Sequence, residues 1–144
     1  MAGINPLSAA RALARRLAVQ ALYRWQLNTG PWQDLVLEFA ADKDMPRADA
    51  AYFRDVLQFV CEQHEALDSA LAPLLDRKPA DLDPVEHAVL LVGAWELRER
   101  RDVPYRVVIN EAVSLTKRFG ATDGHKFVNG VLDRAARQWR SEEH

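Results

Sequence analysis

The stretch that most constrains the fold runs from Asp83 to Leu97. No charged residue interrupts the apolar side chains between Ala88 and Trp95. A helix without a polar face has little surface that favours water, so we expect other elements to surround this one. A membrane span is the alternative, but a span needs about 20 apolar residues and this run is shorter. The sequence therefore predicts a central, buried helix.

The start of this helix carries strong local signals. Asp83 can cap it, Pro84 suits the first helical position, and Glu86 stands where a capping box places its carboxylate. Gly93, inside the helix, is less favourable than alanine there by roughly 1 kcal/mol. That unfavourable choice is most easily explained by close packing, so we expect another backbone to lie against Gly93.

Length and composition limit the class of protein. A chain of 144 residues can form one domain or two small subdomains with a real core. Its composition, 49% hydrophobic and 28% charged, is typical of a soluble globular protein, and its first 24 residues contain no long apolar stretch. We expect no signal peptide, no membrane partner and a cytoplasmic location. Cys61 is the only cysteine, so we expect no intrachain disulfide, and neither a metal nor a cofactor.

The charges are unevenly distributed along the chain. Residues 1–27 carry four arginines and no acidic residue, whereas residues 28–102 carry eight basic and sixteen acidic residues. Residues 103–140 are again basic, with seven basic and three acidic residues. If the two basic ends meet in space, they form one positive face on an acidic body. The alternative is that these are ordinary solvated side chains.

Helical spacing recurs along the rest of the chain, and no β pattern interrupts it. Turn signals at 28–31, 42–46 and 103–104 separate the helical segments, and Pro73 is expected to kink or break a long one. The last helix is expected to begin with Asp123 as its cap. We predict an all-α fold with an N-terminal helical subdomain at about 8–78 and a C-terminal one at about 83–140. The subdomain boundary is expected at 76–82.

Two groups of residues have the chemistry of a nucleic-acid surface. Near the N-terminus, Arg11 and Arg15 share a helix face and Arg16 lies beside them, followed by Tyr23. Guanidinium groups can contact phosphates, and a phenol ring can stack on a base. The alternative places Tyr23 at the edge of the core.

The last helix supplies the second group. Spacing allows four apolar residues to be buried without Phe127: Val128, Val131, Leu132 and Ala135. Phe127 borders Lys126 and Asn129, and an aromatic ring in that setting can stack on an unpaired base. Statistics for aromatic residues favour the core instead, so both placements stay open.

Four segments of the sequence resemble the NusB family of bacterial transcription antitermination factors. They are Ala-Val-Gln-Ala-Leu-Tyr-Arg-Trp-Gln-Leu at 18–27, Tyr-Phe-Arg-Asp at 52–55, Val-Pro-Tyr-Arg-Val-Val-Ile-Asn-Glu-Ala-Val at 103–113 and His-Lys-Phe-Val-Asn-Gly-Val-Leu-Asp at 125–133. The resemblance extends nearly end to end. It implies two small helical bundles packed as one compact unit. It also implies binding of boxA RNA, jointly with the ribosomal protein NusE, within the RNA polymerase antitermination complex of ribosomal RNA operons.

The resemblance also implies which residues form the two surfaces. The implied RNA-binding residues are Arg11, Arg15, Arg16, Tyr23, Asp123, Lys126, Phe127 and Asn129. The implied NusE-binding residues are Glu86, Tyr105, Arg106 and Glu111. Two departures from the family pattern stand out: Ala12 and Leu13 interrupt the arginine run, and Gly124 replaces a frequent serine. We expect weaker intrinsic RNA affinity from the first departure and no hydroxyl contact at the second.

Other functional classes have less support in the sequence. It contains no glycine-rich phosphate loop, nucleophile elbow or His-Glu metal motif, so we expect no enzyme. This domain can also precede RNA cytosine methyltransferases, but 144 residues leave no room for a cofactor-binding fold. The alternative that stays open is a helical protein–protein interaction module without direct RNA binding. Salt-sensitive RNA binding would distinguish the two functions.

Overall fold

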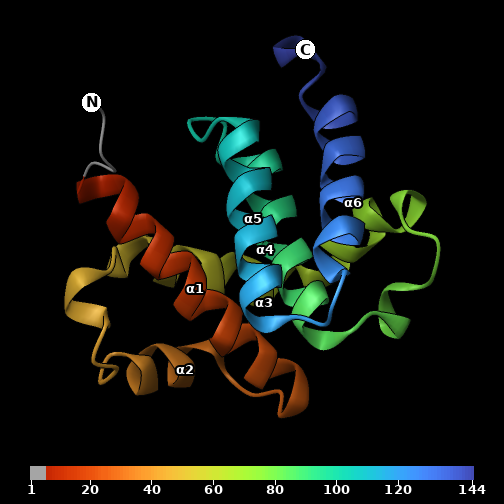
Figure 1. Ribbon diagram of the computed structural model, residues 1–144. Helices are drawn as coiled ribbons and strands as arrows, with labels where there is room; N and C mark the ends of the chain where they lie inside the picture. The colour runs from red at the N-terminus through yellow and green to blue at the C-terminus, as the bar shows by residue number, and fades with distance from the viewer. Residues whose placement is uncertain (1–5) are drawn as a thin grey trace. The chain divides into compact units, whose positions relative to one another are not determined.

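The computed structural model describes residues 6–144, and every regular element in that range is helical (Figure 1). The all-α prediction is confirmed. The chain divides into two compact units between Glu62 and Gln63. The α-helices are α1 (Pro6–Leu27), α2 (Trp32–Phe39), α3 (Ala50–Leu71), α4 (Pro84–Glu99), α5 (Tyr105–Phe119) and α6 (Gly124–Trp139). Short 3-10 turns are η1 (Met45–Arg47), η2 (Ala72–Leu74), η3 (Pro79–Asp81) and η4 (Ser141–Glu143).

The first unit contains α1, α2, η1 and the beginning of α3. Aromatic side chains form part of its interior, because the rings of Phe39 and Phe53 lie 5.7 Å apart between centroids. The start of α3 is stabilised by Asp49, whose side chain accepts a hydrogen bond from the backbone N–H of Tyr52 at 3.0 Å. Asp49 thereby fills the usual role of an acidic residue before a first helical turn.

The division between the two compact units lies inside α3, whereas the sequence predicted a subdomain boundary at 76–82. At Gln63 the backbone leaves helical geometry, with φ −122° and ψ 19°. No proline or glycine marks this kink in the sequence. Pro73 does end the long helix as predicted, since α3 stops at Leu71 and Pro73 lies within η2.

The second unit is organised around α4, as the sequence predicted. Asp83 caps this helix, because its Oδ2 accepts hydrogen bonds from the backbone N–H groups of Val85 and Glu86, both at 3.1 Å. Every residue from Ala88 to Leu97 is buried. The expectation of a central helix without a water-facing side is therefore confirmed.

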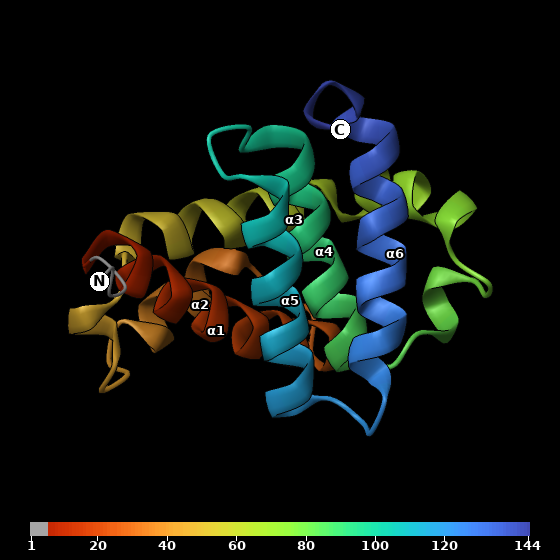
Figure 2. The ribbon, with the colours of Figure 1, turned by 45° about the horizontal axis from the view of Figure 1, so that its top comes forward.

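Helices α5 and α6 pack beside α4 in the second unit, and all three contact one another (Figure 2). A Cβ atom placed on Gly93 of α4 would lie 2.9 Å from Cδ1 of Leu132 in α6. Close packing at Gly93 is thus real, but a leucine side chain fills the space. The prediction of a second backbone there is wrong. Over the described residues, no helix is long and apolar enough to cross a membrane.

Candidate nucleic-acid interface

The arginines of α1 lie against side chains of the first unit. Nε of Arg11 is 3.7 Å from Oδ2 of Asp49, and its guanidinium carbon lies 4.7 Å from the centre of the Tyr52 ring. The guanidinium carbon of Arg15 lies 5.5 Å from the same ring. These distances are those of cation–π contacts, and the predicted sharing of one helix face by Arg11 and Arg15 is confirmed.

Arg15 is unsuited to a direct phosphate contact in this structure. The residue is only 4% exposed, so its guanidinium offers an RNA almost no surface. Arginine often buries its stem while its charged head stays in water, but here the head lies over an aromatic ring. We therefore leave Arg15 out of the proposed RNA-binding residues.

Arg16 is more accessible but already engaged. Its Nη2 donates a hydrogen bond to Oδ2 of Asp44 at 2.8 Å, and Arg47 pairs with the other oxygen of the same carboxylate. A phosphate at Arg16 therefore competes with Asp44 or binds the remaining N–H groups of the guanidinium. Tyr23 lies seven residues further along α1, on about the same side of the helix. Tyr23 is 37% exposed, so its ring is available for stacking.

The beginning of α6 differs from its predicted form at Asp123. This residue has a left-handed backbone, with φ 69°, and its side chain makes no capping hydrogen bond. The prediction of an Asp123 side-chain cap is therefore wrong, because this backbone geometry differs from the extended geometry usual for caps. Its Oδ1 instead lies 3.4 Å from Nζ of Lys126, and both side chains are exposed.

Phe127 and Asn129 lie on different edges of α6. Residues two apart on a helix are separated by about 200° around the axis, so the side chains of Phe127 and Asn129 point to different sides of α6. Asn129 and Lys126 are exposed, whereas Phe127 is half-buried. Phe127 is absent from the buried core of α6, which includes Val128 and Leu132. The prediction that α6 can bury its core residues without Phe127 is therefore confirmed.

Sequence reasoning missed a residue that lies next to Phe127. The guanidinium carbon of Arg77, in the connector between η2 and η3, lies 4.4 Å from the centre of the Phe127 ring. The sequence offered one signal, because Arg77 and Lys78 are adjacent basic residues in an otherwise acidic region. The sequence itself predicts only a subdomain boundary in this segment.

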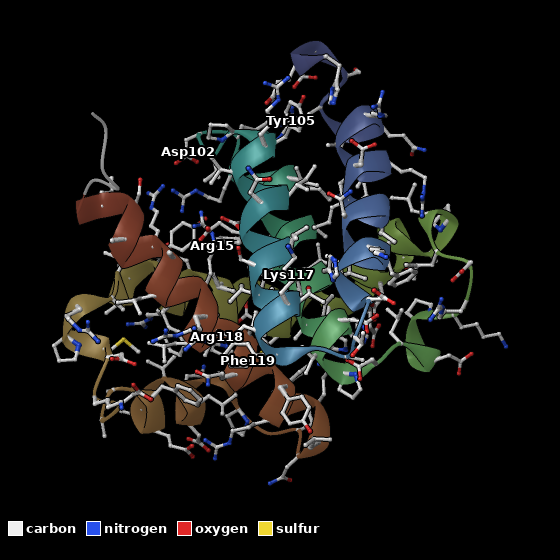
Figure 3. The ribbon with its side chains drawn as sticks, in the orientation of Figure 1. Arg15, Asp102, Tyr105, Lys117, Arg118 and Phe119 are labelled. Atoms are coloured by element: carbon white, nitrogen blue, oxygen red, sulfur yellow. The ribbon has the colours of Figure 1, made fainter. Side chains whose placement is uncertain are left out.

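The residues implied for protein binding form two separate groups. Tyr105 and Arg106 begin α5, where Nε of Arg106 donates a hydrogen bond to the Tyr105 hydroxyl at 3.2 Å. Figure 3 shows Tyr105 at one end of α5 and Lys117 at the other. Glu111 is half-buried and lies about 120° around the helix axis from Tyr105.

Glu86 belongs to the opposite end of this bundle. A Cβ atom on Gly124 would lie 2.7 Å from Oε2 of Glu86 and 3.4 Å from Cγ2 of Thr116. Thr116 is eleven residues from Tyr105, about 16 Å along α5. The structure therefore does not bring Glu86 next to Tyr105, and at 7% exposure Glu86 offers little surface to a partner. Burial raises the pKa of Glu86, with a further increase from the charge of Asp83.

Gly124 lies close to the side chain of Glu86. A Cβ atom at position 124 would overlap the Glu86 carboxylate unless that flexible side chain moved. The beginnings of α4 and α6 therefore approach each other closely at this position.

Comparisons with known proteins identify the family. The model of the NusB family matches residues 12–137 of the chain. The chain belongs to the NusB family. The transcription antitermination protein NusB of Stenotrophomonas maltophilia is 50% identical over 141 residues, covering 98% of this chain and 87% of the relative. NusB of Alcanivorax borkumensis is 51% identical over 140 residues, covering 96% and 93%.

Solved NusB structures share the fold. T. maritima NusB matches with a TM-score of 0.79 and 26% identity, covering 89% of this chain and 91% of the other. A complex of the antitermination factors NusB and NusE with double-stranded RNA matches with a TM-score of 0.72 and 27% identity. That match covers 88% of this chain and 96% of the other. The resemblance noted in the four sequence segments is confirmed.

Proposed function

We propose that this protein is a transcription antitermination factor that binds the boxA RNA of ribosomal RNA operons together with NusE. The observation that carries the proposal is membership of the NusB family across nearly the whole chain. A structure of similar fold, in which NusB is bound with NusE and RNA, supports the choice of partners. The role is one of binding and not of catalysis. We place it in the cytoplasm, within the RNA polymerase antitermination complex.

The proposed RNA-binding residues are those of the set implied by the family resemblance that are exposed or half-buried in the structure. They are Arg11, Arg16, Tyr23, Asp123, Lys126, Phe127 and Asn129. Lys126 is the most exposed cation among them, with 73% of its side chain accessible. It can reach a phosphate without breaking any buried contact. Arg11 and Arg16 each lie beside a carboxylate that competes with a phosphate. For NusE, we propose Tyr105 and Arg106, with Glu111 as a further contact.

The test is a titration of boxA RNA against the protein at several salt concentrations, with and without NusE. We expect Lys126→Ala to weaken binding and to reduce the slope of log affinity against log salt by about one, since one phosphate contact is lost. Lys43→Ala is the matched control, because it removes one exposed lysine that is not among the proposed RNA-binding residues. Folding of both variants should match the wild type.

The result also distinguishes the alternative function. Binding of NusE without any salt-dependent binding of RNA, even in the presence of NusE, would favour a protein–protein interaction module. Identical salt slopes for Lys126→Ala and Lys43→Ala would exclude Lys126 from the interface.

A further inference from the structure

The connector between η2 and η3 lies against α6 on one side of the bundle. Figures 1 and 2 show this connector, coloured yellow-green to green, beside α6 on the side away from α5. Nη2 of Arg134 in α6 donates a hydrogen bond to the backbone oxygen of Leu74 at 2.9 Å. Seven residues earlier on the same helix, the guanidinium carbon of Arg77 lies over the Phe127 ring, 4.4 Å from its centre. The connector is therefore attached to the helix that bears the proposed RNA-binding residues.

Arg77 has the geometry of a phosphate-binding residue. Its Nε donates to Oδ1 of Asp76 at 2.7 Å, and its Nη2 donates to Oδ2 at 3.3 Å. Two parallel N–H donors to two oxygens are the arrangement by which arginine binds carboxylate or phosphate. The stack on Phe127 holds the guanidinium plane in place, so a phosphate meets a fork whose orientation is already set.

The carboxylate of Asp76 is a partner that can be exchanged. The side chains of Arg77 and Asp76 are 44% and 70% exposed, and ion pairs in such exposed surroundings contribute little to stability. Replacing Asp76 by an RNA phosphate therefore requires little free energy. Two exposed cations lie near this pair, because Lys78 follows Arg77 in the chain and Arg134 contacts the same connector at Leu74.

We propose that Arg77 contacts an RNA phosphate beside Phe127, and that Asp76 occupies its guanidinium until RNA binds. This inference rests on the proposed RNA-binding function and adds the connector to the interface. It assigns Phe127 two roles: its ring positions Arg77 and offers its remaining surface to a base. Asp76 then acts as an internal competitor of the RNA backbone.

The first test compares Arg77→Ala with Lys78→Ala. Both variants remove one exposed positive charge from adjacent connector residues, but only Arg77 is stacked on Phe127. In titrations of boxA RNA over a salt series, we expect Arg77→Ala to weaken binding roughly tenfold and to reduce the salt slope by about one. Lys78→Ala should change the slope much less. Equal effects of the two variants would overturn the proposal, because Arg77 would then act only through its contribution to the overall electrostatic potential of the surface.

The second test concerns the competitor. We expect Asp76→Asn to tighten RNA binding, and to do so more than Asp81→Asn, which removes an exposed acid from the same connector. The gain from Asp76→Asn should disappear when Arg77 is already alanine. If the gain persists in that background, Asp76 does not compete for Arg77 and the proposal is refuted.

Different results would refute the proposed RNA-binding function and the proposed role of Arg77. No salt-dependent binding of boxA RNA by the wild type, with or without NusE, would refute the proposed function itself. Normal wild-type binding with indistinguishable Arg77→Ala and Lys78→Ala variants would refute only the role of Arg77. Circular dichroism of each variant shows whether the fold is retained, so a lost affinity is compared only between folded proteins.

Discussion

Arg140 is completely buried at the end of α6, although arginine is rarely buried without partners. Its guanidinium donates hydrogen bonds to the backbone oxygens of Glu96 at 2.8 Å, Leu97 at 3.0 Å and Arg100 at 2.9 Å, and also to that of Val103. These oxygens belong to the last turn of α4 and the loop that follows. A cation at a helix C-terminus also interacts favourably with the helix dipole. Arg140 therefore fastens the end of α6 to the end of α4.

We expect Arg140→Met to lower the free energy of unfolding by about 2–6 kcal/mol. The reason is that the backbone oxygens of Leu97 and Val103 lose the Arg140 donor, and each unsatisfied buried group costs about 1–3 kcal/mol, whereas the oxygens of Glu96 and Arg100 keep backbone N–H donors. Urea denaturation measures the change. Arg137→Met is the control, because Arg137 is exposed on the same helix and pairs with the exposed side chain of Asp133 rather than with buried carbonyl groups. Equal losses for the two variants would contradict the structural role of Arg140.

At the scale of elements, the packing of α4 against α6 depends on Gly93. A methyl group there would overlap Leu132, which is fully buried. Alanine gains about 1 kcal/mol of helix propensity over glycine, whereas an extra methyl in a packed core costs about 1–3 kcal/mol. We expect Gly93→Ala to be net destabilising in thermal or urea unfolding.

The sign should reverse when Leu132 is shortened. In the Leu132→Ala background the overlap is gone, so Gly93→Ala should then stabilise the protein through propensity and filling of space. A double-mutant cycle measures this coupling. Additive effects of the two changes would show that Leu132 does not limit the size of residue 93.

The beginnings of α4 and α6 meet at Glu86, and this contact gives a pH dependence. Burial raises the pKa of Glu86 above its ordinary value of 4.5. The folded protein therefore binds this proton more tightly than the unfolded chain, and stability from this group increases as the pH falls through the raised pKa. At neutral pH, the ionised and poorly solvated carboxylate lowers the free energy of unfolding.

We expect Glu86→Gln to be more stable than the wild type at pH 7, and to lose this advantage as the pH falls towards 4.5 and below. Urea midpoints measured across that range test the expectation. Glu65→Gln, which changes an exposed residue of α3, should show no such convergence. A Glu86→Gln difference that is constant with pH would mean that the Glu86 charge is not the cause.

At the scale of the whole molecule, four arginines of the two basic segments are less accessible than the sequence suggested. Arg15 and Arg140 are buried, and Arg11 and Arg16 face Asp49 and Asp44. These four side chains therefore contribute less to an RNA-binding surface than their number suggests. We expect low intrinsic RNA affinity that rises when NusE adds its own surface.

The coupling between the two partners has to be reciprocal. If NusE increases the affinity for boxA RNA by some factor, RNA increases the affinity for NusE by the same factor. Four titrations close this thermodynamic cycle. Independent binding of RNA and NusE would contradict the expectation of a joint surface.

The sequence by itself determined which segments are helical and how α4 begins. Those signals act over a few residues: apolar spacing, the Asp83 cap, and the prolines at 73 and 84. The family motifs further identified the class of protein. The core positions of α6 also followed from spacing, because a helix repeats every 3.6 residues whatever surrounds it.

Only the tertiary structure decided how individual polar side chains are used. The contacts of Arg140 with α4, of Arg77 with Phe127 and of Glu86 with Gly124 each join residues 38 or more positions apart. No periodic pattern specifies such pairs, because they depend on how helices pack and on which buried groups need a partner. The sequence also does not predict the kink at Gln63, since no proline or glycine lies at that position. Local propensity determines each helix, whereas packing determines which charges stay at the surface and can bind a partner.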